Sequence, residues 1–198
     1  MYDYIRGTLI ELNPADVTLE VGGIGYHILI SLTTYSSLQK GSREGVKLYL
    51  HQHLREDEEL LFGFFDKEER IMFRHLISVS GIGPGTARMM LSSMTPDEVF
   101  NAIVTQDVNR IKSVKGIGMK TAQRVILELQ DKIGKGASAA GFPFDSGVAP
   151  SAIRQEAATA LVLLGFTKPN VEKVLDKLLK EDPSVALEEL IKKALKLL

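Results

Sequence analysis

A chain of 198 residues with 44% hydrophobic and 25% charged side chains has an ordinary globular composition and room for two or three small domains. It contains no cysteine, which excludes disulfides, thiol catalysis and cysteine-based metal sites and fits a reducing compartment. The start lacks a basic stretch followed by an apolar one, and no apolar run could cross a bilayer, so we expect no signal peptide, no membrane span and a cytoplasmic location.

The net charge of −1 hides an uneven distribution of charge along the chain. Residues 1–64 carry five basic and nine acidic side chains, whereas residues 65–136 carry eleven basic and eight acidic ones. The second segment is therefore the part of the chain in which an anionic partner, such as nucleic acid, is expected to bind.

The first 64 residues predict five β-strands. Runs rich in Val, Ile, Leu and Tyr, several of them alternating apolar with polar residues, cover residues 4–12, 16–22, 25–31, 46–54 and 59–65. Turns are marked by residues 13–16 and by Gly22-Gly23, and a short helix is expected near residues 34–38. Five strands with a helix between the third and the fourth is the order of an OB-fold barrel.

The hydrophobic period changes after Asp66, and residues 65–142 predict an all-helical domain. The apolar residues of its first helix that follow the helical period are Ile71, Met72, Phe73, Leu76 and Val79. Thr95, Pro96 and Glu98 have the spacing of an N-cap, a first helical position and a capping box.

The remaining residues predict a linker and a small helical bundle. Residues 143–150 belong to a stretch rich in Gly, Ala, Ser and Pro, which is typical of a flexible linker. Residues 151–198 predict three amphipathic helices, because apolar residues recur there at i, i+3, i+4 and i+7. The second and third of these helices are separated at residues 182–184. The apolar residues of the third are Leu187, Leu190, Ile191, Ala194, Leu195 and Leu198.

A ten-residue motif occurs twice in the helical domain, 35 residues apart. Its copies are SVSGIGPGTA from Ser78 and SVKGIGMKTA from Ser113. Glycine permits left-handed backbone angles and close approach of another molecule, and the central isoleucine is expected to point into the core. The N–H groups that begin the following helix have no partner in that helix, and the helix dipole adds positive charge there, so a phosphate fits. Each copy therefore predicts a helix–hairpin–helix motif that binds the DNA backbone largely independently of base sequence.

The predicted phosphate-binding residues are the two Gly-Ile-Gly bends, the helix starts that follow them and the nearby cations. In the first hairpin they are Gly81, Ile82, Gly83, Gly85, Thr86 and Arg88, and in the second they are Lys115, Gly116, Ile117, Gly118, Lys120, Thr121 and Arg124. Each cation is also compatible with an ordinary solvated helix surface. A single bend is compatible with a purely structural turn, and it is the duplication in register that favours phosphate binding. Two such hairpins, related by an approximate two-fold axis, could contact both strands across a minor groove.

Four consecutive acids, Glu56 to Glu59, follow the fourth predicted strand. They are compatible with a solvated turn, the usual place of a charge run, or with the metal site of a structure-selective nuclease. Adjacent acids on one turn rarely converge on one ion, and His51 and His53 beside them lack a ligand-spacing motif, so the metal site is less favoured. The chain has no Walker-type loop, H-E-x-x-H motif or triad, so we expect no catalytic residue, no metal, no cofactor and no ATPase activity.

The order of these features along the whole chain closely resembles the RuvA family of bacterial Holliday-junction-binding proteins. The specific matches are EVGGIGY, RED, LLFGF, GIGPGTA and GIGMKTAQR. The resemblance implies an OB-fold tetramer core at residues 1–64, a tandem helix-hairpin-helix domain at 65–142, a linker at 143–150 and a UBA-like three-helix bundle at 151–198. It also implies a non-catalytic subunit that holds a four-way junction flat and open during recombination, repair and the SOS response.

The resemblance implies partners and further site residues as well. Glu56 and Asp57 would form an acidic pin at the centre of the junction, where their charge repels phosphates. The C-terminal bundle would contact the hexameric ATPase RuvB, and the stretch most suited to that contact comprises Leu161, Leu164, Gly165 and Phe166. A homotetramer is also implied, with either one tetramer or an octamer on DNA, and the resolvase RuvC is implied as a further partner.

This chain departs from the family at two hairpin positions. Relatives commonly have lysine where this chain has Gly85 and Met119. We therefore expect weaker and less salt-sensitive DNA binding than in a typical member, unless Arg88 or Lys115 compensates. The alternatives to a junction-binding scaffold remain the nuclease and a protein-interaction adaptor whose hairpins are only structural.

Overall fold

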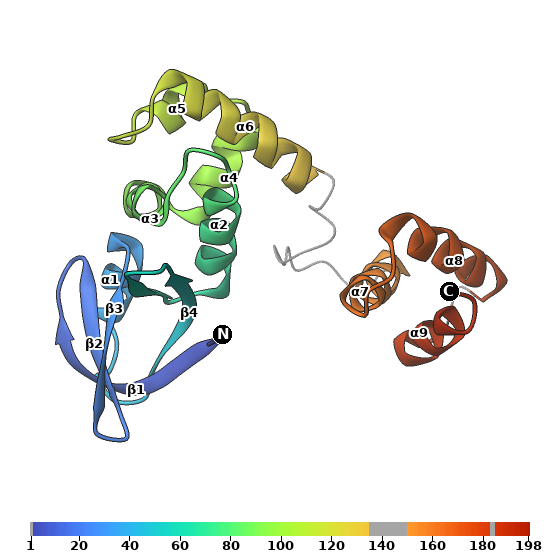
Figure 1. Ribbon diagram of the computed structural model, residues 1–198, viewed down its shortest axis with the longest axis horizontal. Helices are drawn as coiled ribbons and strands as arrows, with labels where there is room; N and C mark the ends of the chain where they lie inside the picture. The colour runs from blue at the N-terminus through green and yellow to red at the C-terminus, as the bar shows by residue number, and fades with distance from the viewer. Residues whose placement is uncertain (1, 135–149, 183–184) are drawn as a thin grey trace. The chain divides into compact units, whose positions relative to one another are not determined.

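The computed structural model describes residues 2–134, 150–182 and 185–198 (Figure 1). These residues fall into two compact units, one within Met1–Gly134 and the other within Lys135–Leu198. The predicted linker at residues 143–150 lies outside the described residues, except that a helix begins at Pro150.

The five predicted strands form a closed barrel in the order β1-β2-β3-β5-β4, with β4 pairing back to β1 (Figure 1). Their bounds are Tyr4–Leu12 for β1, Asp16–Val21 for β2, Ile24–Leu29 for β3, Val46–Leu54 for β4 and Glu59–Phe64 for β5. All neighbours are antiparallel except β3 and β5, which pair in parallel at Leu29 and Phe62. Val17, Leu19, Ile28 and Leu48 fill the barrel and have no exposed surface. The OB-fold prediction is confirmed.

The helix between β3 and β4, α1 (Leu32–Leu38), begins two residues earlier than the sequence predicts. Its N-cap is Ser31, whose hydroxyl accepts a hydrogen bond from the Thr34 N–H at 3.0 Å. Because this cap satisfies a free N–H at the helix start, the helix can begin directly after the strand.

The rest of the first unit is helical, as predicted. Its helices are α2 (Lys67–Ile77), α3 (Pro84–Ser93), α4 (Pro96–Val104), α5 (Val108–Lys112) and α6 (Met119–Gly134). The predicted capping box of α4 is present, since Thr95 Oγ1 accepts from the Glu98 N–H and Glu98 Oε2 accepts from the Thr95 N–H. This backbone hydrogen bond is the main reason why the pKa of Glu98 is lowered.

The apolar residues on the helical period of α2 are not buried equally. Met72, Phe73, Leu76 and Val79 are buried, whereas Ile71 is only partly buried. The reason is that α2 also buries a polar strip, Glu69 and Arg70, against the barrel.

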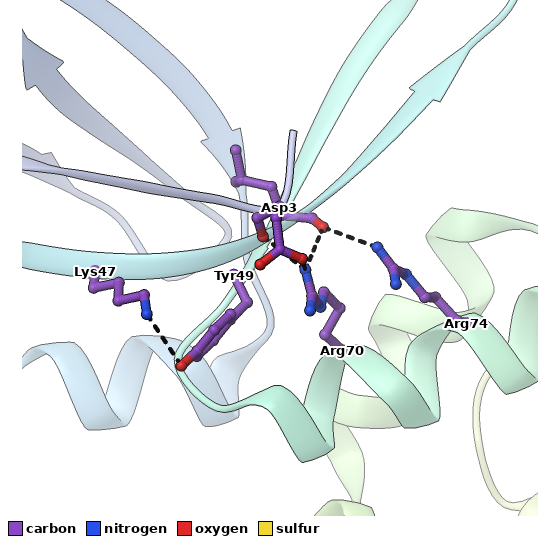
Figure 2. A network of polar contacts seen from close by, with 6 residues as sticks. Asp3, Lys47, Tyr49, Arg70 and Arg74 are labelled. Carbon is purple, nitrogen blue, oxygen red and sulfur yellow. Dashed lines mark hydrogen bonds and ion pairs between the residues drawn. The ribbon is translucent and has the colours of Figure 1, made fainter. Parts of the chain in front are cut away.

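Aromatic and polar contacts join α2 to the barrel. Phe73 packs against Phe62 and Phe64, with ring centroids 5.1 and 4.9 Å apart. Figure 2 shows Arg70 reaching Asp3, where its Nη1 lies 2.6 Å from both the backbone oxygen and Oδ1. This hydrogen bond lowers the pKa of Asp3. Residues 2–134 therefore form one packed unit in which the barrel positions the helices.

The second unit is a bundle of α7 (Pro150–Leu163), α8 (Lys168–Glu181) and α9 (Leu187–Leu195). Its centre contains Ala157, Leu161, Val171, Leu175, Leu190 and Ala194, all without exposed surface. The three-helix prediction is confirmed, but Leu195, expected on the apolar face of α9, is 42% exposed. In the ranges that the structure describes, no helix is long and apolar enough to cross a membrane.

Candidate nucleic-acid interface

The first hairpin joins α2 to α3 through Gly81, Ile82 and Gly83. Gly81 has a φ of +93°, in the left-handed region that strains any residue with a side chain. Ile82 points into the core, with 5% of its surface exposed, and its N–H donates to the Val79 carbonyl at 3.0 Å. Gly83 is the N-cap of α3, with an ordinary φ of −85°. The bend therefore anchors its isoleucine and leaves the backbone of both glycines at the surface.

The second hairpin, between α5 and α6, repeats this geometry. Gly116 has a φ of +89°, and Ile117 is 5% exposed. The Ile117 N–H donates to the Val114 carbonyl at 3.1 Å. The repeated phrase in the sequence thus corresponds to one backbone conformation built twice.

Each bend presents backbone donors at the start of a helix. The first intrahelical bonds run from the Ala87 N–H to the Gly83 carbonyl in α3 and from the Ala122 N–H to the Gly118 carbonyl in α6. The N–H groups before them have no acceptor within their own helix. A methyl group placed on Gly83, Gly85 or Gly118 would meet no atom within 4 Å, so another molecule can approach this backbone.

The two sets of donors are unequal. In α6 the first-turn donors come from Met119, Lys120 and Thr121, whereas in α3 the first position is Pro84, which has no N–H. The first-turn N–H donors of the first hairpin therefore come from Gly85 and Thr86. The second hairpin offers more donors as well as more cations.

The two hairpins lie next to each other and are tied together by α6. A methyl group on Gly81 would lie 3.9 Å from Thr121 Cγ2. Arg124 donates to the Ser80 carbonyl at 3.3 Å, and Lys132 Nζ donates to Ser78 Oγ at 2.8 Å. Because α6 contacts the turn of the first hairpin and begins at the second, it links the two helix starts.

The predicted cations divide into two groups. Lys115, Lys120 and Arg124 are exposed, and neither lysine has an ion-pair partner among the described residues. Arg124 is partly engaged, because it donates to the Ser80 carbonyl and its Nε lies 3.9 Å from Glu128 Oε1. Arg88, by contrast, donates from Nη1 to the Ala15 carbonyl, between β1 and β2, at 2.9 Å. Its guanidinium is held against the barrel rather than left free beside the bend.

The acidic run forms the turn of the β4–β5 ribbon, closed by the Arg55 N–H donating to the Glu58 carbonyl at 2.8 Å. Glu56 and Asp57 are exposed at its tip. Within the described ranges there is no group of three or more His, Asp or Glu residues that could hold a metal ion. The barrel thus presents a negative tip, whereas the helices of the same unit present backbone donors and cations.

The stretch proposed from the sequence for partner binding is only partly at the surface of the second unit. Leu161 has no exposed surface and Phe166 packs against the bundle core, so these two support the fold. Leu164 is 62% exposed and is followed by Gly165 at a φ of +103°. The sequence-based prediction missed Val162 and Leu163, of which the latter is 82% exposed. We call Val162, Leu163 and Leu164 the apolar edge.

Comparison with known proteins covers nearly the whole chain. Family models match at residues 1–63 (RuvA N terminal domain), 73–131 (SAM-like helix-hairpin-helix tandem) and 152–198 (RuvA, C-terminal domain). Relatives named Holliday junction branch migration complex subunit RuvA are 52% identical in Cytophaga hutchinsonii, 47% in Bacteroides thetaiotaomicron and 43% in Porphyromonas gingivalis. Each comparison covers at least 99% of both chains.

Alanine substitutions at two glycines of the first hairpin distinguish the effect of backbone strain from the effect of blocking a phosphate. Gly83→Ala should fold and lower the free energy of unfolding by only a few tenths of a kcal/mol, the cost of alanine at an N-cap, because its φ is ordinary and the space around it is open. The methyl group should nevertheless displace a phosphate and lower DNA affinity about tenfold, as expected for one lost hydrogen bond to a charged group. Gly81→Ala should instead lower the free energy of unfolding by about 1 kcal/mol or more.

These two effects are measured by DNA titration and by urea unfolding followed by tyrosine fluorescence. All five tyrosines lie in residues 1–64, so the signal reports only on the first unit. Unchanged DNA affinity in Gly83→Ala would contradict phosphate binding at this bend.

The cations of the second hairpin are tested by replacing Lys120 and Arg124 together with alanine. DNA affinity should fall, and the slope of log affinity against log salt should flatten by up to about 2, since each phosphate contact contributes about 0.9. Replacing Lys173 and Lys177 of α8 is the matched control, with the same loss of charge in the other unit. An unchanged slope in the hairpin variant would show that neither cation contacts a DNA phosphate.

Proposed function

The chain belongs to the RuvA family, and on this premise we propose that it grips a Holliday junction through its two hairpins as the non-catalytic subunit of a branch migration complex. The observation that carries the proposal is the pair of in-register bends, each opening a helix whose first N–H groups are free for phosphate oxygens. Such contacts are independent of base sequence, which suits a junction that moves along DNA.

The opposite charges of the first unit explain how a junction could be held open. The hairpins attract the backbones of the arms, while Glu56 and Asp57 repel phosphates at the strand crossover. The ATPase of the complex is a separate protein, RuvB, and this chain serves as the DNA-binding scaffold.

We further propose that four copies assemble as a tetramer with one copy for each arm. Cyclic symmetry lets one interface serve all four subunits and matches the four arms of the junction. The acidic turns would then meet at the centre. A second tetramer on the opposite face of the DNA would give an octamer, and RuvC would use that face when it is free.

The second unit is proposed to recruit RuvB through the apolar edge. An exposed apolar group at the end of α7 suits contact with another protein, because removing the side chains of Leu163 and Leu164 from water lowers the free energy. Leu161 and Phe166 would support this surface from the core.

The central test compares a four-way junction with a linear duplex of the same sequences in a gel-shift titration. We expect tighter binding to the junction, together with an assembly mass of four or eight chains in solution. Equal affinity for both DNAs, or a monomer bound to the junction, would contradict the proposal.

Recruitment of the motor is tested with a double replacement, Leu163→Ser and Leu164→Ser. Junction affinity should be unchanged and stimulation of the RuvB ATPase should be lost, as in a chain that lacks residues 151–198. Leu197→Ser is the control, because Leu197 is 53% exposed in the same unit. Loss of junction binding in the double variant would show that the two functions are not separable.

A further inference from the structure

A buried polar cluster joins the barrel to the hairpin helices at the start of α1. Glu69 of α2 is 1% exposed, and its two carboxylate oxygens accept hydrogen bonds from the hydroxyls of Ser31 and Thr34, the latter at 2.6 Å. Ser31 and Thr34 have no exposed surface. We call Ser31, Thr34 and Glu69 the α1 clasp.

Every hydrogen bond of the α1 clasp has a defined direction. The Thr34 N–H donates to Ser31 Oγ at 3.0 Å, and the Phe65 N–H donates to Thr34 Oγ1 at 3.0 Å. Each hydroxyl thus accepts from the backbone and gives its own hydrogen to the carboxylate, which only accepts when ionised. A shift of α2 along α1 would break both bonds to Glu69 together.

The helix that follows the first hairpin is attached to the same turn of α1. Ser92 Oγ of α3 accepts from the Leu32 N–H at 3.1 Å, and the Leu91 carbonyl accepts from Thr33 Oγ1 at 2.7 Å. The helices on both sides of the first hairpin are therefore bound to the barrel at one point.

Stability alone is a poor explanation for a carboxylate at this place. Burial raises the pKa of Glu69, which means that removing its charge from water is unfavourable despite the two hydroxyls. A well-packed apolar side chain would avoid this penalty but could slide against its neighbours. A fully satisfied polar cluster instead selects one relative arrangement of the two parts.

We propose that Glu69 is a positioning residue for junction recognition, because the α1 clasp holds the hairpins at one fixed separation from the acidic turn. This inference rests on the proposed function. Linear duplex requires only the hairpins, whereas a junction requires hairpins and acidic turn in register. Loosening the clasp should therefore lower junction affinity and leave duplex affinity unchanged.

Two matched pairs of variants test the clasp in the full-length chain. Glu69→Gln removes the buried charge, and Glu68→Gln makes the same charge change one residue earlier on α2. Thr34→Val removes a hydroxyl at nearly constant shape, and Thr34→Ser retains the hydroxyl. Tyrosine fluorescence during urea unfolding identifies variants that are folded, and Thr34→Val keeps the test valid if Glu69→Gln does not fold.

The first measurement is the ratio of junction affinity to duplex affinity. Glu69→Gln and Thr34→Val should lower this ratio at least about fivefold, the lower range of coupling between separate sites, while Glu68→Gln and Thr34→Ser keep it. An unchanged ratio in the two clasp variants would overturn the inference. A parallel fall in duplex affinity would do so too, because it would show that the clasp only supports the fold of the hairpins.

The second measurement is the distance between spin labels on the acidic turn and on α6. The chain has no cysteine, so Glu58→Cys and Gln123→Cys create the only two labelling positions. The labelled chain is mixed with an excess of unlabelled chain, so that each assembly carries one labelled copy and only the distance within one chain is measured. One narrow distance distribution is then expected with the intact clasp and a broader one in Glu69→Gln and Thr34→Val. Equal widths would overturn the inference. A chain with an intact clasp but no preference for junctions would instead overturn the proposed function, a result that the label distances distinguish.

Discussion

The first N–H groups of an α-helix have no acceptor in their own helix, and the arrangement of the first unit depends on placing two such helix starts at the surface. A left-handed glycine turns the chain at each bend, and a buried isoleucine pins the turn to the core. The same groups that the fold cannot satisfy internally are those that a phosphate satisfies. On the proposed function, the backbone N–H groups therefore carry the recognition of DNA, and side-chain cations add to it.

The second feature of this unit is that an acidic turn and a set of free backbone donors belong to one packed body. The barrel carries the negative turn, the helices carry the donors, and Phe73 and Arg70 join the two parts over α2. Arg88 also belongs to this joint, since it binds the Ala15 carbonyl of the barrel. Arg88, which the sequence analysis assigns to DNA binding, thus helps to hold α3 against the barrel.

Local patterns in the sequence were sufficient for most of the fold. The bounds of β1 and β4, the capping box at Thr95 and the conformation of both bends follow from alternation, capping residues and glycine placement, which act over a few residues. Such patterns do not separate buried from exposed residues in the stretch that begins at Leu161, because it contains both this core residue and the exposed Leu164. Only the packing of the bundle separates the two.

Contacts between distant residues could not be predicted. Glu69 reads as an ordinary acid in the first turn of a helix, and its partner Ser31 is 38 residues earlier in the chain. Nothing local distinguishes it from Glu68, which is not buried. The same holds for Arg88, whose acceptor lies 73 residues away.

The link that α6 makes between the two bends also bears on the width of the DNA groove that the hairpin pair can span. Because Arg124 and Lys132 contact the first hairpin while the second hairpin begins the same helix, movement of one helix start relative to the other is restrained. RNA helices adopt the A-form, with a wide, shallow minor groove and different spacing of phosphates across it. We therefore expect a receptor pair of nearly constant span to distinguish these two helical forms without contact to the 2′-hydroxyl.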